Sequence, residues 1–449
     1  MILTNDTGRL ALTAACFAAY GLTCLLPWLR YRRKRAAARA DAAPGGWLLA
    51  YASQTGNAED LARQTAATLR LAGIAVQTME LSTLDEAALR GAERALFIVS
   101  TYGEGNAPDA AAAFASRIMT RALPLPSLHY AVLALGDSAY SQFCGFGRAL
   151  DAWLAEQGAQ PLFERIDVDR SSSQALGHWR QQLSHLAGTS DAPDWGAPAF
   201  ASWRLAERRI VNPGSAGAPL AHLELEPVEG SLPEWQSGDL AQIAPPADAE
   251  HARDYSIASI PEDGRLHLLV RLHGHADGSH GAASGWLHHA PLGATVRLRL
   301  RQHRRFRLED NAARPLILIG NGSGMAGLRG HLKARVLAGQ ARNWLLFGER
   351  NAAHDMHYGE ELAAWREAGL LERMDLAFSR DQQERRYVQD LLPEHASTLR
   401  AWLADGAAIY VCGSLEGMAA GVDAALRQIA GNAELDALAA AGRYRRDVY

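Results

Sequence analysis

The chain has 449 residues, of which 48% are apolar and 21% charged, and its formal net charge is −4. This composition excludes a disordered, collagen-like or many-span membrane protein, and the near-neutral charge argues against a broad nucleic-acid-binding surface. Two or three domains are expected from the length. The cysteines are Cys16, Cys24, Cys144 and Cys412. They are too few for a disulfide framework and lack metal-ligand spacing, so no structural zinc is expected.

The first 46 residues differ from the rest in charge: they carry seven basic and two acidic residues, so the remainder carries about −9. Residues 10–29 are uncharged, and about 20 residues at about 1.5 Å each span roughly 30 Å of hydrocarbon. The basic run at 30–35 follows directly. We therefore predict an anchor at 1–46 with a transmembrane helix at 10–29, in the inner (cytoplasmic) membrane with the domains that follow it cytoplasmic. The alternatives are a cleaved signal peptide, whose charges would come first, and an amphipathic or core helix, which needs a polar face.

The rest of the chain alternates between two kinds of pattern. Residues 47–187 alternate apolar runs with helix-like segments, which predicts a doubly wound α/β sheet. Residues 188–200 are rich in Gly, Pro and small polar residues and are interpreted as a linker. Short strands across 201–312 predict an antiparallel β-barrel. Residues 313–449 return to alternation and predict a second α/β domain.

A first cofactor-binding loop is predicted between a strand and a helix that starts near Glu59. It reads Ser53-Gln54-Thr55-Gly56-Asn57-Ala58. Hydroxyls and amides at a helix N-terminus suit a phosphate, because backbone N–H groups and the helix dipole point at it. The loop has no lysine, so it is not the nucleoside-triphosphate loop. An ordinary capped helix start is the alternative.

Two further loops follow later strands of the same predicted sheet. They read Ser100-Thr101-Tyr102-Gly103-Glu104-Gly105 and Leu135-Gly136-Asp137-Ser138-Ala139-Tyr140. All three loops leave the carboxyl ends of parallel strands, which is the ligand-binding edge of an open sheet. A phosphate cradle and two aromatic rings are what a planar flavin mononucleotide needs. Two surface tyrosines beside structural glycines are the alternative.

Residues 47–187 resemble the flavodoxin-like domain of diflavin reductases. By this resemblance Tyr102 and Tyr140 sandwich FMN, and backbone contacts come from the glycines. The FMN-binding set that it implies is Ser53, Gln54, Thr55, Gly56, Asn57, Ala58, Ser100, Thr101, Tyr102, Gly103, Gly105, Leu135, Gly136, Asp137 and Tyr140.

The barrel region carries two motifs, Arg253-Asp254-Tyr255-Ser256 on a strand and His280-Gly281-Ala282-Ala283-Ser284 opening a helix. Arginine offers charge-assisted bonds to phosphate, and the turn adds backbone donors. The region resembles the ferredoxin-NADP reductase superfamily, which implies that Arg253 binds the FAD pyrophosphate, Tyr255 the ring, and Ser256 the reactive N5. Gly281, Ala282 and Ser284 complete the implied FAD set. Histidines from His267 to His303 are spaced too irregularly for a metal site.

The last region contains a glycine-rich turn after a strand and a polar segment after a later strand. Both belong to NADPH by the resemblance, which favours NADPH over NADH because a hydroxyl, guanidiniums and a ring suit an adenosine 2′-phosphate. The implied residues are Gly322, Ser323, Gly324, Arg350, Ser379, Arg380, Arg385, Tyr387 and Gln389. A solvated charged helix is the alternative for the second segment.

The C-terminus completes the likeness. In the family a terminal aromatic covers the FAD ring and yields to nicotinamide, while a cysteine and an acidic residue flank the hydride path, which implies these roles for Tyr449, Cys412 and Asp447. A plain buried thiol is the alternative for Cys412. The resemblance covers residues 47–449 and is nearest to the flavoprotein subunits of NADPH-sulfite reductases and to NADPH-haemoprotein reductases.

Two departures from the family pattern stand out. Only about a dozen residues separate Asp239 from Arg253, where the family usually inserts a helical connecting domain that sets the spacing of its flavins. The NADPH turn has Asn321, Ser323, Gly327 and Leu328 where Pro, Thr, Pro and Phe are usual.

The leading functional hypothesis is a membrane-anchored NADPH-dependent diflavin reductase. Electrons pass from NADPH to FAD, to FMN and then to a one-electron acceptor, a haem protein or ferric complex at the membrane, because a hydride carries two electrons together. The first alternative is the electron-donating flavoprotein of a sulfite reductase. The second is a non-catalytic, flavin-bearing membrane sensor or scaffold, which the altered NADPH turn permits.

Overall fold

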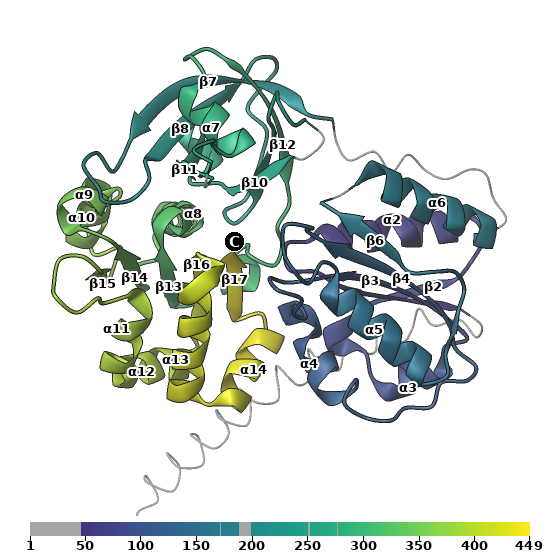
Figure 1. Ribbon diagram of the computed structural model, residues 1–449. Coiled ribbons are helices and arrows are strands. Elements are labelled where there is room, and N and C mark those ends of the chain that lie inside the picture. The colour runs from purple at the N-terminus through teal and green to yellow at the C-terminus, as the bar shows by residue number, and fades with distance from the viewer. Residues whose placement is uncertain (1–45, 171, 188–198, 250–251, 276) are drawn as a thin grey trace, which may run out of the picture. The chain divides into compact units, whose positions relative to one another are not determined.

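The structure is a computed structural model, and it describes residues 46–170, 172–187, 199–249, 252–275 and 277–449. These residues fall into two compact units, each of which is described by itself (Figure 1). The first unit comprises residues 46–53, 58–169 and 173–187, and the second comprises the other described residues.

The first unit is built on a parallel sheet with strand order β2-β1-β3-β4-β5, and β6 also pairs with β4. Its strands are β1 (Trp47–Ala52), β2 (Val76–Glu80), β3 (Arg94–Ser100), β4 (His129–Gly136), β5 (Gln160–Pro161) and β6 (Ile166–Asp169). The central strands are buried on both faces, which is why they read as unbroken apolar runs.

Helices cover both faces of this sheet, with α2 and α6 on one side and α3, α4 and α5 on the other (Figure 1). Their bounds are α2 (Asn57–Leu71), α3 (Glu86–Gly91), α4 (Asp109–Arg117), α5 (Gly145–Glu156) and α6 (Ser173–Ala187), with a 3₁₀ turn, η1, at Leu81–Thr83. The start of α3 is fixed by a capping residue, because the Asp85 side chain accepts a 2.9 Å hydrogen bond from Ala88 N in the first turn.

The second unit begins with an antiparallel sheet of order β10-β9-β12-β7-β8-β11. An isolated bridge between Ile257 and Leu268 joins the segments at its two edges, so the sheet closes into a barrel. Its strands are β7 (Ala201–Ile210), β8 (Leu220–Pro227), β9 (Leu240–Ala244), β10 (Arg253–Ser256), β11 (Leu266–Arg271) and β12 (Thr295–Arg301). Helix α7 (Ala282–His289) lies between β11 and β12 in the chain, and the 3₁₀ turn η2 (Pro261–Asp263) precedes β11.

A five-stranded parallel sheet of order β15-β14-β13-β16-β17 completes the second unit. Its strands are β13 (Leu316–Asn321), β14 (Asn343–Glu349), β15 (Arg373–Phe378), β16 (Ala408–Gly413) and β17 (Tyr444–Val448). Its helices are α8 (Met325–Leu337), α9 (Ala352–Asp355), α10 (Gly359–Glu367), α11 (Val388–Glu394), α12 (Ala396–Ala404), α13 (Ala420–Ala430) and α14 (Asn432–Ala440). Short turns are the 3₁₀ helices η3 (Glu309–Asn311) and η4 (Gly322–Gly324) and the π-helix η5 (Leu415–Ala419).

The barrel and this sheet share one hydrophobic core, in which barrel residues such as Leu220 and Leu269 join Leu318 and Leu345 of the sheet. Helix α8 lies between the two layers (Figure 1). A glycine on α8 permits the close approach, since a Cβ atom on Gly330 would lie 2.9 Å from Ile257 O. The two layers therefore pack as one body, and residues from both can form one site.

The predicted fold class included a transmembrane helix at residues 10–29, and the predicted inner-membrane location depended on it. That segment lies outside the described residues. In the part of the chain that the structure describes, no helix is both long and apolar enough to cross a bilayer. The predicted transmembrane part of the fold class and the predicted inner-membrane location are therefore wrong.

Candidate functional site

The loop after β1 is shaped by a serine and a glycine. Ser53 is fully buried, and its Oγ accepts a 3.2 Å hydrogen bond from Ala58 N in the first turn of α2. Gly56 has φ +90°, a backbone conformation that favours glycine. The three other residues predicted to bind phosphate, Gln54, Thr55 and Asn57, belong to the same turn.

The loops after β3 and β4 lie side by side. Ser141 donates from both its N and its Oγ to Glu104 Oε2, at 3.1 and 2.6 Å. A tight bridge between Tyr102 and Asn106 closes the first loop, in which Gly105 has φ +94°. The structure thus brings together two of the three loops that the sequence predicted at this sheet edge.

The side chains at this edge fit a flavin. Tyr102 and Tyr140 are each half-buried. Thr101 Oγ1 is buried, and among the described residues it has no hydrogen-bond partner, as expected of a group that bonds a ligand. The remaining predicted FMN residues, Ser100, Gly103, Leu135, Gly136 and Asp137, lie at the strand ends and in the same two loops.

The FAD motifs occupy the barrel edge near β10 and the start of α7. Arg253 is partly exposed, with its Nη2 3.6 Å from Asp248 Oδ2, and Tyr255 packs against the barrel core. Ser284 Oγ accepts a 3.2 Å bond from His273 N, which fixes the turn that also contains Gly281 and Ala282. Burial raises the pKa of Tyr255, so its phenol is neutral.

Three predicted residues of the hydride path converge in one buried cluster. Ser256 Oγ, at the end of β10, donates a 2.7 Å hydrogen bond to Asp447 Oδ2 on β17. Cys412 Sγ, on β16, lies 3.8 Å from the same oxygen. Burial raises the pKa of Asp447 to about 6, although the hydrogen bond from Ser256 opposes this rise. Burial also raises the pKa of Cys412 well above its ordinary value, so the thiol is neutral.

A fourth residue of this cluster was not predicted. His303 is fully buried, and its Nε2 lies 3.7 Å from Asp447 Oδ1. Burial lowers the pKa of His303 to about 3, so its ring is neutral. Within the described chain neither ring nitrogen has a hydrogen-bond partner. The sequence offered only an irregularly spaced histidine in an arginine-rich stretch, which carries no signal for this position.

The glycine-rich turn packs tightly on the end of β16. A Cβ atom on Gly324 would lie 2.1 Å from Cys412 O, so no other residue fits there. Asn321, one of the departures from the family pattern, accepts a 2.9 Å bond from Ser414 N through its Oδ1. The Tyr449 hydroxyl lies 3.2 Å from Ser323 Oγ, and Tyr449 as a whole residue is 53% exposed. The C-terminal ring and the turn therefore meet.

The residues assigned to the 2′-phosphate are only partly gathered. Ser379 N donates to Glu349 O and Arg380 N donates to Arg350 O, both at 2.8 Å, which places Ser379, Arg380 and Arg350 at neighbouring strand ends. Arg385 and Tyr387 are exposed on the segment that leads into α11. Gln389 is on α11, where its side chain packs against Gly421.

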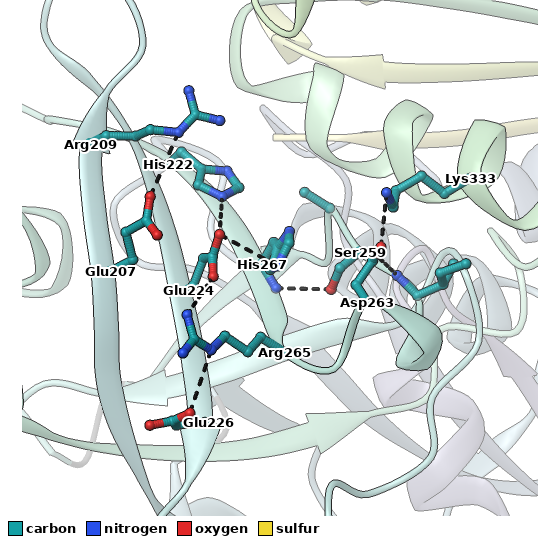
Figure 2. Close-up of polar contacts among 12 residues, drawn as sticks. Glu207, Arg209, His222, Glu224, Glu226, Ser259, Asp263, Arg265, His267 and Lys333 are labelled. Atoms are coloured by element: carbon teal, nitrogen blue, oxygen red, sulfur yellow. Dashed lines mark hydrogen bonds and ion pairs between the residues drawn. The ribbon is translucent and has the colours of Figure 1, made fainter. Parts of the chain in front are cut away.

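Two groupings among the described residues have metal-ligand geometry, and in each the glutamate already pairs with an arginine. They are His222–Glu224–His267 and Glu349–Asp355–His357. Figure 2 shows Glu224 between the two histidines and Arg265, whose Nη1 lies 2.9 Å from Glu224 Oε2. Arg271 pairs with Glu349 in the second grouping. We interpret both as polar networks, because the arginine supplies the positive charge that a cation would otherwise bring.

A flavodoxin-like sheet followed by a barrel and a nucleotide-binding sheet defines a two-flavin oxidoreductase. A family model described as flavodoxin matches residues 49–179, and one described as oxidoreductase NAD-binding domain matches residues 318–424. The sulfite reductase [NADPH] flavoprotein alpha-component of Neisseria meningitidis is 30% identical over 89% of this chain and 88% of that protein. Proteins of the same name from Vibrio cholerae (29%; 91% and 88%) and Aliivibrio fischeri (28%; 92% and 91%) are also similar.

The chain belongs to the diflavin reductase family. It is an NADPH-dependent oxidoreductase whose cofactors are FMN, FAD and NADPH. The buried Thr101 hydroxyl, the Ser256 cluster and the tight glycine turn are compatible with these groups.

Proposed function

We propose that this reductase delivers electrons from NADPH to an iron-containing one-electron acceptor, and that the acceptor is the haemoprotein of a sulfite reductase. The observation that carries the redox part is the buried cluster of Ser256, Cys412 and Asp447, which draws one group from the barrel and two from the nucleotide-binding sheet. When bound, the two flavins turn the hydride of NADPH into single electrons.

Each residue of the cluster has a proposed task. Ser256 donates to Asp447 and thereby fixes the orientation of the carboxyl beside the nicotinamide position. The pKa of Asp447, raised by burial to about 6, lets this carboxyl hold or release a proton near neutral pH. The neutral Cys412 thiol fills the wall of the site and excludes water. Tyr449 covers the ring position and moves aside for nicotinamide.

Other residues have proposed binding roles. The loops after β1, β3 and β4 hold FMN, and Arg253 with the α7 turn holds the FAD pyrophosphate through its guanidinium and backbone N–H groups. The glycine turn holds the NADPH pyrophosphate. Ser379, Arg380, Arg385, Tyr387 and Gln389 hold the 2′-phosphate end.

The acceptor is proposed from the relatives, each of which is named sulfite reductase [NADPH] flavoprotein alpha-component. Their similarity runs along about nine-tenths of this chain. A different haem protein or a ferric complex is the competing acceptor.

An anaerobic NADPH titration, after HPLC has measured the FMN and FAD content, tests the redox part. About one flavin of each kind should be present, and NADPH should bleach both, whereas NADH should act weakly. Ser256→Ala should keep its flavins and slow the bleaching by roughly 10-fold or more. Missing FAD, or an unchanged spectrum with NADPH, would instead support the flavin-bearing sensor or scaffold.

The acceptor is tested separately with a purified sirohaem sulfite reductase haemoprotein. NADPH-driven reduction of its haem, in proportion to the reductase added, would support the proposal. A protein that bleaches with NADPH but reduces cytochrome or ferric complexes and not the sirohaem protein would exclude the sulfite assignment alone.

A further inference from the structure

An ion pair lies against the glycine turn of the nucleotide-binding sheet. Arg271, which ends β11, donates from Nη2 to Oε1 of Glu349, which ends β14. The side chain of Glu349 is 4% exposed and that of Arg271 is 24% exposed. A Cβ atom on Gly322 would lie 3.3 Å from Arg271 Nη2 and 3.5 Å from Glu349 Oε1. Both charged groups are therefore in contact range of the turn.

The carboxylate of Glu349 carries a fixed negative charge. Burial alone would raise the pKa of Glu349, but the hydrogen bond from His357 and the charge of Arg271 outweigh burial and hold the pKa below its usual range. Its oxygens are also fixed by neighbours, since Arg350 N donates to Oε2 at 3.1 Å and His357 Nε2 lies 3.4 Å from Oε1. Glu349 is therefore ionised and immobile near the turn at neutral pH.

A pyrophosphate at this turn would meet an unfavourable neighbour. The start of α8 offers backbone N–H groups and a positive dipole end. The Glu349 carboxylate, however, lies next to Gly322 of the same turn and repels a phosphate. Arg271 is a cation that contacts both the carboxylate and the turn. Its Nη1 donates to Ala218 O at 3.2 Å, and its side chain is 24% exposed, so an incoming anion can reach it.

We propose that Glu349 holds Arg271 in an internal ion pair over the glycine turn, and that the pyrophosphate of NADPH must take Arg271 from Glu349 to bind. Glu349 thereby weakens the binding of NADPH and NADP⁺. It is an affinity-setting residue for the known cofactor and favours release of the oxidised nucleotide. This inference rests on NADPH binding and is independent of which acceptor the reductase serves.

The test compares two nucleotides on the flavin-loaded full chain by calorimetry. NADP⁺ contains the pyrophosphate, whereas 2′-AMP contains the phosphate of the adenosine end and no pyrophosphate. Glu349→Gln should bind NADP⁺ roughly 10-fold more tightly, because the charged carboxylate no longer competes with the pyrophosphate for Arg271. A tenfold change in affinity corresponds to about one charge-assisted hydrogen bond. Binding of 2′-AMP should stay within about twofold.

The matched control is Glu226→Gln, which removes a carboxylate from a barrel ion pair with Arg204 and Arg265. It should leave the affinity for both nucleotides unchanged. Arg271→Gln should weaken NADP⁺ binding, and adding Glu349→Gln to it should then have a smaller effect than in the wild type. Weaker or unchanged NADP⁺ binding by Glu349→Gln would overturn the proposal, because Glu349 would then position Arg271 for the ligand. An equal gain for 2′-AMP would overturn it too.

A second measurement needs no variant, in case Glu349→Gln does not fold. Crystal structures of the holoenzyme with and without NADP⁺ should show Arg271 on Glu349 in the free form and on the pyrophosphate in the complex. An Arg271–Glu349 pair that persists in the complex would overturn the proposal. Neither measurement involves electron transfer, so failure of the proposed acceptor leaves the result interpretable.

Discussion

The two units differ in what they bury. In the described part of the first unit, the buried polar side chains are Ser53, Thr65 and Thr68, and none of them is charged. The described part of the second unit buries arginines, histidines and carboxylates, among them Arg329, Arg335, His331 and Asp447. A single sheet covered by amphipathic helices can have an entirely apolar core. A barrel packed against a second sheet also buries loops and polar strand ends.

Burial of charge in the second unit is matched by pairing. Arg329 donates to Ala258 O at 2.6 Å and to Glu361 Oε2 at 2.5 Å, which ties α8 to the barrel and to α10. Figure 2 shows a further tie, in which Lys333 of α8 reaches Asp263 of the barrel at 2.9 Å. An unpaired buried charge is strongly destabilising. The comparison teaches that the stability of the second unit depends on protonation state, whereas that of the first depends on apolar packing.

The largest predicted effect is acid destabilisation of the second unit. Burial lowers the pKa of His222 and His267 to about 4, and that of His303 and His331 to about 3. Below pH 6.5 the unfolded chain binds protons that these folded histidines do not, so the free energy of unfolding falls as the pH drops. We expect a loss of roughly 5 kcal/mol between pH 7 and pH 5.

Hydrogen exchange read by mass spectrometry separates the two units in this experiment. Peptides of the barrel and its attached sheet should lose protection between pH 7 and pH 5, after correction for intrinsic exchange. The described histidines of the first unit, His129, His178 and His185, are exposed, so its peptides serve as the internal control. Equal loss in both units would contradict the comparison.

The next effect has the opposite sign and concerns Asp447. Its pKa is raised from 3.8 to about 6, so between these values the folded state holds a proton that the unfolded chain has lost. The stability that this protonation gives is therefore lost as the pH rises toward 6. Asp447→Asn should be more stable than wild type by about 3 kcal/mol at pH 7.5 and nearly equal at pH 4.

Urea unfolding at the two pH values measures this difference, and reduction of FAD by NADPH should slow in the same variant. The exposed Asp405→Asn serves as the control, since its carboxylate pairs at the surface with Arg342. A stability difference that is independent of pH would show that Asp447 does not ionise near neutral pH.

The sequence predicted the sheets well and the buried polar groups poorly. The apolar runs at 47–52 and 95–100 became β1 and β3 because parallel strands are buried on both faces. The loops after β3 and β4 also meet as expected, because they lie at strand ends whose order the fold class fixes. The meeting of Ser256, Asp447 and Cys412 was implied only by the family resemblance.

Two contacts between distant parts of the second unit escaped prediction. His303 meets Asp447 across 144 positions, and Arg271 meets Glu349 across 78. Neither pair has a periodic pattern, and the excess of arginine over lysine removes the signal from any single Arg. The predicted transmembrane helix shows the opposite error. There a local pattern of uncharged and basic residues was enough to predict both a membrane-spanning helix and a cellular location.

Two core substitutions, one in each unit, test whether buried polar groups or apolar packing contribute more to stability. Arg335 is 1% exposed and donates to Asn343 Oδ1, Ala312 O and Arg342 O, so Arg335→Leu should cost about 3 kcal/mol by leaving these acceptors unpaired. In the first unit, Trp179→Phe loses volume and the 3.2 Å bond to Thr65 Oγ1 and should cost about 1.5 kcal/mol. Urea unfolding measures both, and a larger cost for Trp179→Phe would reverse the comparison.

The smallest effect is expected where a charge pair of the second unit is exposed. Arg204 Nη2 lies 2.6 Å from Glu226 Oε1, but the Arg204 side chain is 56% exposed. Water screens this pair and both side chains lose rotamer freedom in it, so Arg204→Gln should cost less than about 0.5 kcal/mol, and less still in 0.5 M salt. The same urea experiment measures it. A cost near that of Arg335→Leu would mean that the number of charges, and not their burial, distinguishes the second unit from the first.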